Sequence, residues 1–200
     1  MIKAVLFDFG GVLAEEGFRE GLKAIAKEKG LDPEAFYTTS ADLVYQTGYI
    51  TGRCDEHFYW NAVRKKTGVK GDDQEFREEI LKRFELRPEM TAVVKKIKSS
   101  GFIVAILSDQ TNWLDELNQR TPFHHRFDHV FNSFHLGKTK RDPSIFRDVC
   151  NLLGFRLGEV LFVDDNLENV RRAANQGLKA IHFKGSREFQ IEIKKFVEMP

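Results

Sequence analysis

Five short apolar segments, separated by helical patterns, constrain the fold of this chain more than any other feature. They cover residues 4–7, 102–107, 130–131, 160–163 and 180–183. None of them alternates polar with apolar residues, which is typical of strands covered on both faces of a parallel sheet. Because helical patterns lie between these strands, the sequence predicts an α/β fold with a doubly wound, Rossmann-like and mostly parallel sheet.

The helical patterns contain residues that start and stop helices. We expect one helix to begin at Pro88 and to end before Gly101. We expect another to be capped by Asp142 with Pro143 in its first turn, and a third to stop at Gly177. Proline suits the first turn of a helix, and glycine suits the position just beyond its end.

One stretch interrupts this alternation. Residues 15–86 contain no convincing strand, but they carry several apolar stripes at helical spacing. We therefore expect a helical domain at 15–86, inserted after the first strand. Residues 1–14 and 87–200 then form the α/β core domain.

Composition excludes several classes of protein. The 31 basic and 30 acidic side chains give a net charge of +1, which does not fit a strongly basic nucleic-acid binder. The longest apolar run has six residues (102–107), whereas a membrane-spanning helix needs about 20. Cys54 and Cys150 are far apart in the sequence, which argues against a disulfide framework. We expect a cytoplasmic monomer or homodimer with no nucleic-acid or membrane partner.

Polar residues follow the predicted strands. In an open α/β sheet, ligands bind beyond the carboxyl ends of the strands. Asp8 follows the first strand, Ser108 follows the second, and Asp164 and Asp165 follow the fourth. Lys140 lies in the connection after the third strand. We therefore expect three carboxylates, a hydroxyl and an ammonium group to meet at one edge of the sheet.

The chemistry of this set indicates a metal. Carboxylates about 4 Å apart repel by roughly 4 kcal/mol per pair at an effective dielectric constant near 20. A divalent cation among them removes this penalty, and ligands that are all oxygens favour Mg²⁺ over Zn²⁺. Together, Mg²⁺, a lysine and a hydroxyl neutralise the charge of a phosphoryl group. The sequence therefore predicts a site that binds phosphoryl groups.

Four ordered stretches resemble the motifs of the haloacid dehalogenase (HAD) superfamily. They are FDFGGVL at 7–13, ILSDQT at 106–111, LGKTKRDPSIF at 136–146 and FVDDN at 162–166. The helical insertion resembles the C1 cap of this superfamily, which closes over small substrates. Within the superfamily, the chain is most similar to the branch that contains bacterial glucose-1-phosphate phosphatase, in which the first motif also has a glycine two residues after the nucleophile.

The resemblance implies a phosphatase mechanism. Asp8 would attack phosphorus and form an aspartyl-phosphate, which divides a slow hydrolysis into two steps. Lys140 would hold both the nucleophile and the phosphate. We prefer Lys140 to Lys138 because it immediately precedes the Arg-Asp-Pro sequence that replaces the common Pro-Asp-Pro.

The resemblance also implies the ligands of the phosphate and of the metal. The phosphoryl oxygens would be bound by the Ser108 hydroxyl, by Lys140, and by the backbone N–H groups of Phe9 and Asp109. The Mg²⁺ ion would be bound by the carboxylates of Asp8, Asp164 and Asp165 and by the backbone carbonyl of Gly10. The sequence leaves open which residue of the pair 164–165 binds the metal directly.

One position departs from the pattern. Most phosphatases of this superfamily have an aspartate where this chain has Gly10, and that aspartate protonates the leaving oxygen and later activates water. Losing such assistance costs a factor of about 10²–10⁴ in rate. The enzyme would then favour leaving groups that need little protonation, or would use an acid from Glu15, Glu16 or the cap.

Three functions follow from these features. The first is a phosphomonoesterase acting on a small phosphorylated metabolite, such as the sugar phosphate glucose 1-phosphate. The second is a non-catalytic protein that binds phosphate, which the glycine at position 10 suggests. The third is a 2-haloacid dehalogenase that uses Asp8 on carbon. That reaction needs no metal and would leave the pair Asp164–Asp165 without an explanation.

Overall fold

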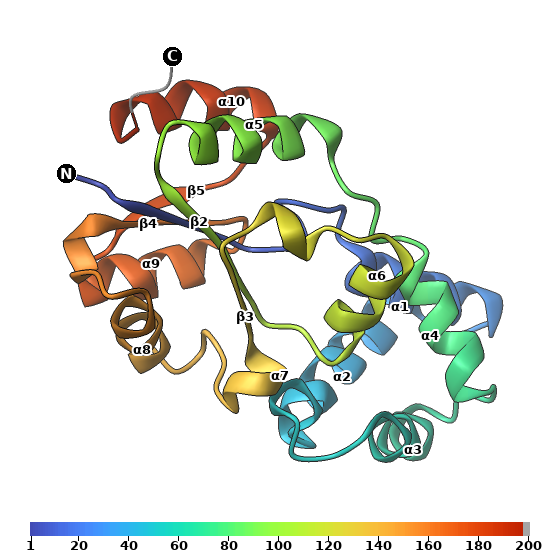
Figure 1. The fold of residues 1–200 in the computed structure, drawn as a ribbon. Helices are drawn as coiled ribbons and strands as arrows, with labels where there is room; N and C mark the ends of the chain where they lie inside the picture. Colours follow the sequence, from blue (N-terminus) through green and yellow to red (C-terminus); the bar gives the residue numbers. More distant parts are fainter. Residues whose placement is uncertain (198–200) are drawn as a thin grey trace.

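The computed structural model describes residues 1–197, and within this range a five-stranded parallel sheet forms the centre of the fold (Figure 1). The strands are β1 (Ala4–Phe7), β2 (Ile103–Ser108), β3 (His129–Asn132), β4 (Val160–Asp164) and β5 (Lys179–His182). Their order is β3-β2-β1-β4-β5, and every neighbouring pair is parallel. The predicted fold class is confirmed, and each strand end lies within one residue of its predicted position.

Two layers of helices cover the two faces of the sheet. Helices α5 (Pro88–Ser99) and α10 (Ser186–Glu192) lie on one face, and α8 (Ser144–Leu153) and α9 (Leu167–Gln176) lie on the other (Figure 1). In β1, Val5 and Phe7 belong to the same apolar cluster as α5 and α10, whereas Ala4 and Leu6 belong to the cluster of α8 and α9. Burial on both faces explains why the strand sequences show no polar alternation.

The predicted helix ends agree with the structure, with one correction. Helix α5 begins at Pro88, Gly101 follows its end with a φ of 86°, and Gly177 ends α9. The helix expected to begin at Pro143 begins one residue later, at Ser144. Pro143 rather than Asp142 is therefore the N-cap residue, and Asp142 lies just before it, where its carboxylate accepts a hydrogen bond from the Ser144 N–H at 3.0 Å.

The segment 15–86 is helical. It contains α1 (Gly17–Glu28), α2 (Pro33–Gln46), the 3₁₀ turn η1 (Tyr49–Thr51), α3 (Glu56–Thr67) and α4 (Asp73–Leu81). The chain enters and leaves it side by side, because the Glu15 N–H donates to the Glu85 carbonyl and the Arg87 N–H donates to the Leu13 carbonyl, each at 2.9 Å. The Arg87 guanidinium also holds the Glu15 carboxylate through two hydrogen bonds of 2.9 Å.

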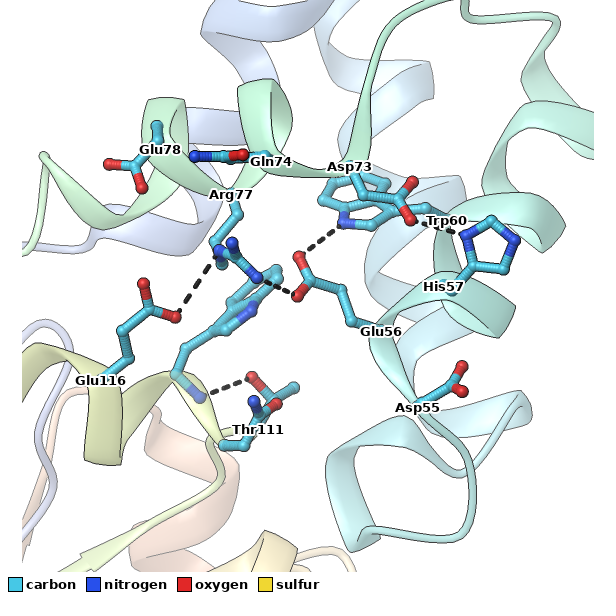
Figure 2. Close-up of polar contacts among 12 residues, drawn as sticks. Asp55, Glu56, His57, Trp60, Asp73, Gln74, Arg77, Glu78, Thr111 and Glu116 are labelled. Carbon is cyan, nitrogen blue, oxygen red and sulfur yellow. Dashed lines mark hydrogen bonds and ion pairs between the residues drawn. The ribbon is translucent and has the colours of Figure 1, made fainter.

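Helix α6 (Trp113–Arg120) joins the sheet to the helical segment. Arg77 of α4 contacts Glu56 of α3 at 2.7 Å and Glu116 of α6 at 3.5 Å, as Figure 2 shows. The buried ring of Trp113 lies 6.2 Å from that of Trp60 in α3. This side of the segment is therefore fixed to α6 by both ion pairs and aromatic packing.

Short helical turns lie between the longer elements and after α10. They are η2 (His124–Arg126), α7 (Ser133–Leu136), η3 (Leu157–Glu159) and η4 (Ile193–Lys195). Within residues 1–197, no helix combines the length and the apolar character needed to cross a bilayer.

A glycine sets the distance between α1 and α4. A Cβ atom added at Gly21 would lie 2.6 Å from the Cα atom of Ile80, which is closer than two carbon atoms can approach. At an exposed position in a helix, replacing glycine with alanine stabilises the fold, because alanine lowers the conformational entropy of the unfolded chain. At this position, the clash with the backbone of α4 outweighs that gain.

We therefore expect Gly21→Ala to lower the free energy of unfolding by about 1–3 kcal/mol, because the added methyl group forces the two helices apart. Gly158 is the matched control, since its backbone is not left-handed and nothing lies within 4 Å of an added Cβ. Gly158→Ala should be neutral or should stabilise by up to about 1 kcal/mol. Urea denaturation measures both, and equal effects of the two substitutions would contradict this account of the packing.

Candidate active site

The sheet topology brings three strand ends together. Strand β1 lies between β2 and β4, so the residues that end or follow these strands are neighbours. Asp8 follows β1, and its N–H donates to the Val163 carbonyl of β4 at 2.8 Å. Ser108 ends β2 and Asp164 ends β4. The polar residues predicted at the edge of the sheet therefore meet.

Lys140 lies at the centre of this cluster. Its Nζ atom is 2.8 Å from Asp8 Oδ2 and 2.6 Å from Asp164 Oδ2, and its side chain is 1% exposed. Burial alone would lower the pKa of Lys140, but the charges of Asp164 and Asp8 outweigh it and raise the pKa above its ordinary value. Lys138 instead pairs with Asp148 at the surface. Of the two lysines considered from the sequence, the structure thus brings Lys140 to the cluster.

The cluster contains more carboxylates than ammonium groups. Oxygen atoms of Asp8, Asp164 and Asp165 all lie within 4.8 Å of one another. Burial raises the pKa of Asp8 well above its ordinary value, and Lys140 opposes this shift. One lysine cannot balance three acids, so the site retains negative charge. Since every donor is an oxygen, the residues fit a hard divalent cation such as Mg²⁺.

The two adjacent aspartates have different surroundings. The buried Asp164 accepts hydrogen bonds from Lys140 Nζ, from the Asn166 N–H at 2.7 Å and from Asn169 Nδ2 at 3.2 Å. Asp165 lines a cavity, and no other residue within 1–197 donates a hydrogen bond to its carboxylate. Asp164 therefore orients the lysine, whereas the oxygens of Asp165 are open to a ligand.

The loop after β1 passes close to Asp165. Gly11 has a φ of 78°, and an added Cβ atom would lie 2.3 Å from Asp165 Oδ2. Both facts require glycine at this position. No role was predicted for Gly11 from the sequence, although the adjacent glycines at positions 10 and 11 were a visible signal.

The residues expected to bind phosphate surround the same point. Ser108 is buried and lines the cavity, and the Phe9 N–H donates to Asp8 Oδ1 at 2.7 Å. The Asp109 carboxylate accepts from the Lys140 N–H at 2.9 Å and from the Tyr45 hydroxyl at 3.4 Å. The side chain of Asp109 thus fixes the loop that carries Lys140.

A cavity of about 350 Å³ lies between the strand ends and the helical segment. Arg141 stacks on the ring of Tyr45, with the guanidinium carbon 3.5 Å from the ring centroid, and Arg19 lies 5.5 Å from the ring centroid of Tyr37. All four side chains line the cavity, and neither arginine is paired with a carboxylate within residues 1–197. No role was predicted for these four side chains from the sequence, because helices α1 and α2 meet the loop that carries Arg141 only in the folded chain.

Known proteins resemble the chain over most of its length. A family model described as haloacid dehalogenase-like hydrolase matches residues 2–177. The chain is 24% identical to a sesquiterpene phosphatase from Aspergillus oryzae, over 98% of this chain and 96% of that protein. It is also 24% identical to a glyceraldehyde 3-phosphate phosphatase from Methanopyrus kandleri, over 100% of this chain and 91% of that protein. Of a drimenol cyclase from Aspergillus calidoustus, 35% identical over 74 residues, the chain spans only 14%.

Solved structures share the fold. A HAD family enzyme from Bacteroides thetaiotaomicron, in complex with magnesium and inorganic phosphate, has a TM-score of 0.71 at 20% identity, covering 92% of this chain and 95% of that chain. An L-2-haloacid dehalogenase from Xanthobacter autotrophicus, with chloropropionic acid covalently bound, has a TM-score of 0.68 at 20% identity, covering 100% and 85%. At this identity, the likenesses establish the fold alone.

The burial of Lys140 leads to a prediction about stability. In Lys140→Met, Asp8 and Asp164 lose their shared counterion inside the protein. Breaking a buried pair in this way costs about 3–5 kcal/mol. We expect a loss of this size in the free energy of unfolding, measured by urea denaturation in the presence of EDTA.

Lys138→Met is the matched control for this prediction. It removes an ion pair of the same type two residues away, but at the surface, where water screens the charges. We expect little change in stability. Equal effects of the two substitutions would mean that Lys140 does not hold the buried carboxylates together.

Proposed function

The chain belongs to the haloacid dehalogenase-like hydrolase family, and we propose that it is a Mg²⁺-dependent phosphomonoesterase acting on a small phosphorylated metabolite. The observation that carries the proposal is the buried Lys140, which contacts both Asp8 and Asp164 beside the open carboxylate of Asp165. A nucleophile, a fixed positive charge and a site for a divalent cation are the groups that phosphoryl transfer requires.

The hydrogen bonds of each carboxylate support a choice of metal ligands. We propose that Asp8 and Asp165 bind Mg²⁺ through their carboxylates and that Gly10 binds it through its carbonyl. Asp164 contributes mainly by holding Lys140, since its oxygens already accept three sets of hydrogen bonds. When bound, the ion would neutralise negative charge on the phosphoryl group.

The protein groups carry the covalent chemistry. The Asp8 carboxylate attacks phosphorus, the bond to the ester oxygen breaks, and an aspartyl-phosphate forms. We propose that the Ser108 hydroxyl, Lys140 and the N–H groups of Phe9 and Asp109 hold the phosphoryl oxygens. The Phe9 N–H would exchange its hydrogen bond to Asp8 Oδ1 for one to the phosphoryl group. Water then attacks phosphorus and releases phosphate from Asp8.

The helical segment limits the size of the substrate. We propose that α1–α4 act as a C1 cap, with the chain divided at the predicted boundaries, 15–86 for the cap and 1–14 with 87–200 for the core. The cavity of about 350 Å³ suits a compact ester, and its tyrosine and arginine side chains suit a polar one. A sugar phosphate such as glucose 1-phosphate fits this description, as does a triose phosphate like the substrate that names the Methanopyrus kandleri relative. A cytoplasmic location agrees with substrates of this kind.

A dehalogenase reaction is the other chemistry that this family suggests. It would use Asp8 on carbon without a metal, and the Xanthobacter autotrophicus dehalogenase that shares the fold has chloropropionic acid covalently bound. The excess of buried carboxylates in this chain favours the metal-dependent reaction. Chloride release from 2-chloroacids tests the alternative.

A substrate panel tests the proposed function. With Mg²⁺, the protein should hydrolyse some phosphorylated metabolites of a panel, and EDTA should abolish phosphate release. Asp8→Asn should remove all turnover, because an amide does not attack phosphorus, and its unfolding midpoint should show that it remains folded. A protein that releases no phosphate from any ester, with or without Mg²⁺, would be a binding protein rather than a phosphatase.

Metal binding should also be visible without catalysis. A ligand that binds only the folded state stabilises it by about 2.7 kcal/mol at a concentration 100 times its Kd. We expect Mg²⁺ to raise the unfolding temperature of the wild type but not of Asp165→Asn. Asp148→Asn, at the surface, is the control and should respond like the wild type. An undiminished response in Asp165→Asn would contradict the ligand assignment.

A further inference from the structure

A carboxylate from another part of the chain lies next to the position where this site lacks one. A Cβ atom added at Gly10 would have Glu16 Oε2 at 3.9 Å and Oε1 at 4.0 Å. The backbone of Gly10 is not left-handed, so another residue could adopt it. An aspartate at position 10 would therefore extend into the neighbourhood of the Glu16 carboxylate.

The position of Glu16 suits a reaction with the leaving group. Glu16 caps the first turn of α1, where its Oε1 atom accepts a hydrogen bond from the Arg19 N–H at 3.4 Å. It lines the same cavity as Asp8 and Lys140, next to Phe18 and Arg19 of the helical segment. Its carboxyl group thus faces the space into which the alcohol part of a phosphoester would extend.

Glu16 and Glu15 have different surroundings. Burial raises the pKa of the Glu16 carboxyl group above its ordinary value, and the hydrogen bond from the Arg19 N–H opposes this shift. Glu15, in contrast, is exposed, and its ion pair with the Arg87 guanidinium lowers the pKa of its carboxyl group. The geometry therefore separates two adjacent glutamates that the sequence alone could not.

We propose that Glu16 is the general acid and base of this site, in place of the carboxylate that Gly10 cannot supply. The inference rests on the proposed phosphatase function and extends it to a substrate class, the phosphoesters of weakly acidic alcohols. Such esters need a proton on the departing oxygen. Without this group, the enzyme would be confined to esters with good leaving groups.

The proton balance of the two steps is complete. In the first step, an Asp8 Oδ atom bonds to phosphorus while the ester P–O bond breaks. The departing ester oxygen keeps the electron pair of that bond and takes the proton of the Glu16 carboxyl group. The products are a free alcohol and a Glu16 carboxylate. In the second step, that carboxylate takes a proton from water as the water oxygen bonds to phosphorus. The bond between phosphorus and Asp8 then breaks, which releases phosphate and restores both side chains.

The decisive test compares leaving groups in Glu16→Gln and Glu15→Gln. The glutamine amide keeps the oxygen that caps α1 but has no acidic proton to give. For alkyl phosphates, Glu16→Gln should lower kcat/KM by about 10²–10⁴-fold. For dinitrophenyl phosphate, kcat/KM should hardly change, whereas kcat should fall and a burst of dinitrophenol should appear because dephosphorylation is slow. Glu15→Gln should behave like the wild type on both substrates.

A second variant tests the location of the acid. Gly10→Asp in the Glu16→Gln background supplies a carboxylate from the other side of the same space, although its Cβ atom would press against the Phe84 ring at 3.3 Å. It should restore part of the lost kcat/KM on alkyl phosphates. A folded double variant that stays as slow as Glu16→Gln would contradict the proposed position of the proton donor.

The outcomes separate this inference from the function on which it rests. A wild-type protein without Mg²⁺-dependent turnover of any ester contradicts the phosphatase function. If the wild type is active but Glu16→Gln lowers kcat/KM by the same factor for every leaving group, or does not lower it at all, the role of Glu16 is contradicted. The phosphatase function is then unaffected.

Discussion

The contact of one buried lysine with two aspartates determines how this site is built. Lys140 Nζ lies within 2.8 Å of both Asp8 and Asp164, in a position that is almost inaccessible to water. A charge so deeply buried is tolerated only when it is paired, and so are the carboxylates around it. The loop that carries Lys140 must therefore stay docked on the ends of β1 and β4, and the Asp109 carboxylate secures it there by accepting the Lys140 N–H.

The contact of Lys140 with Asp8 and Asp164 does not neutralise all the carboxylates of the site. Lys140 and the two asparagines satisfy Asp164, so the unbalanced negative charge lies with Asp8 and Asp165, which face the cavity. We propose that Asp8 and Asp165 hold a divalent cation there, which when bound would offset this charge and that of a phosphoryl group. The protein thus uses one fixed cation to organise the site, and we propose that it uses a second, exchangeable one to complete it.

Much of the fold was predictable from local sequence. The strands are buried on both faces, so their apolar runs identified them, and helix-capping residues such as Pro88, Gly101 and Gly177 marked the helix ends. The start of α8 was misplaced by one residue because Asp142 and Pro143 both suit a first turn. Strand order was not predicted, since the local pattern of a strand does not identify its neighbours.

The site was predictable only in part. Polar residues just after buried strands identified Asp8, Ser108, Asp164 and Asp165, because parallel strands end at the same edge of a sheet. The difference between Asp164 and Asp165 depends on Lys140 and Asn169, which are distant in sequence.

Most residues of the cavity wall could not be predicted from the sequence, because they too come from segments that are distant in sequence. Glu16 follows Gly10 by six residues and was named with Glu15 as a possible acid, but the contact of Tyr45 with Arg141 arises only when the helical segment folds back over the strand ends. Such contacts join segments whose sequences contain no sign of one another. The cavity wall formed by the helical segment was therefore the part that could not be predicted from the sequence.

We propose that Asp8 carries the phosphoryl group during turnover. Rapid acid quenching of the protein while it hydrolyses a substrate with Mg²⁺, followed by peptide mass spectrometry, would detect this intermediate. We expect a transient phosphoryl group on Asp8 in the presence of Mg²⁺ and none in its absence. Steady release of phosphate with no phosphorylated Asp8 at any time point would contradict it.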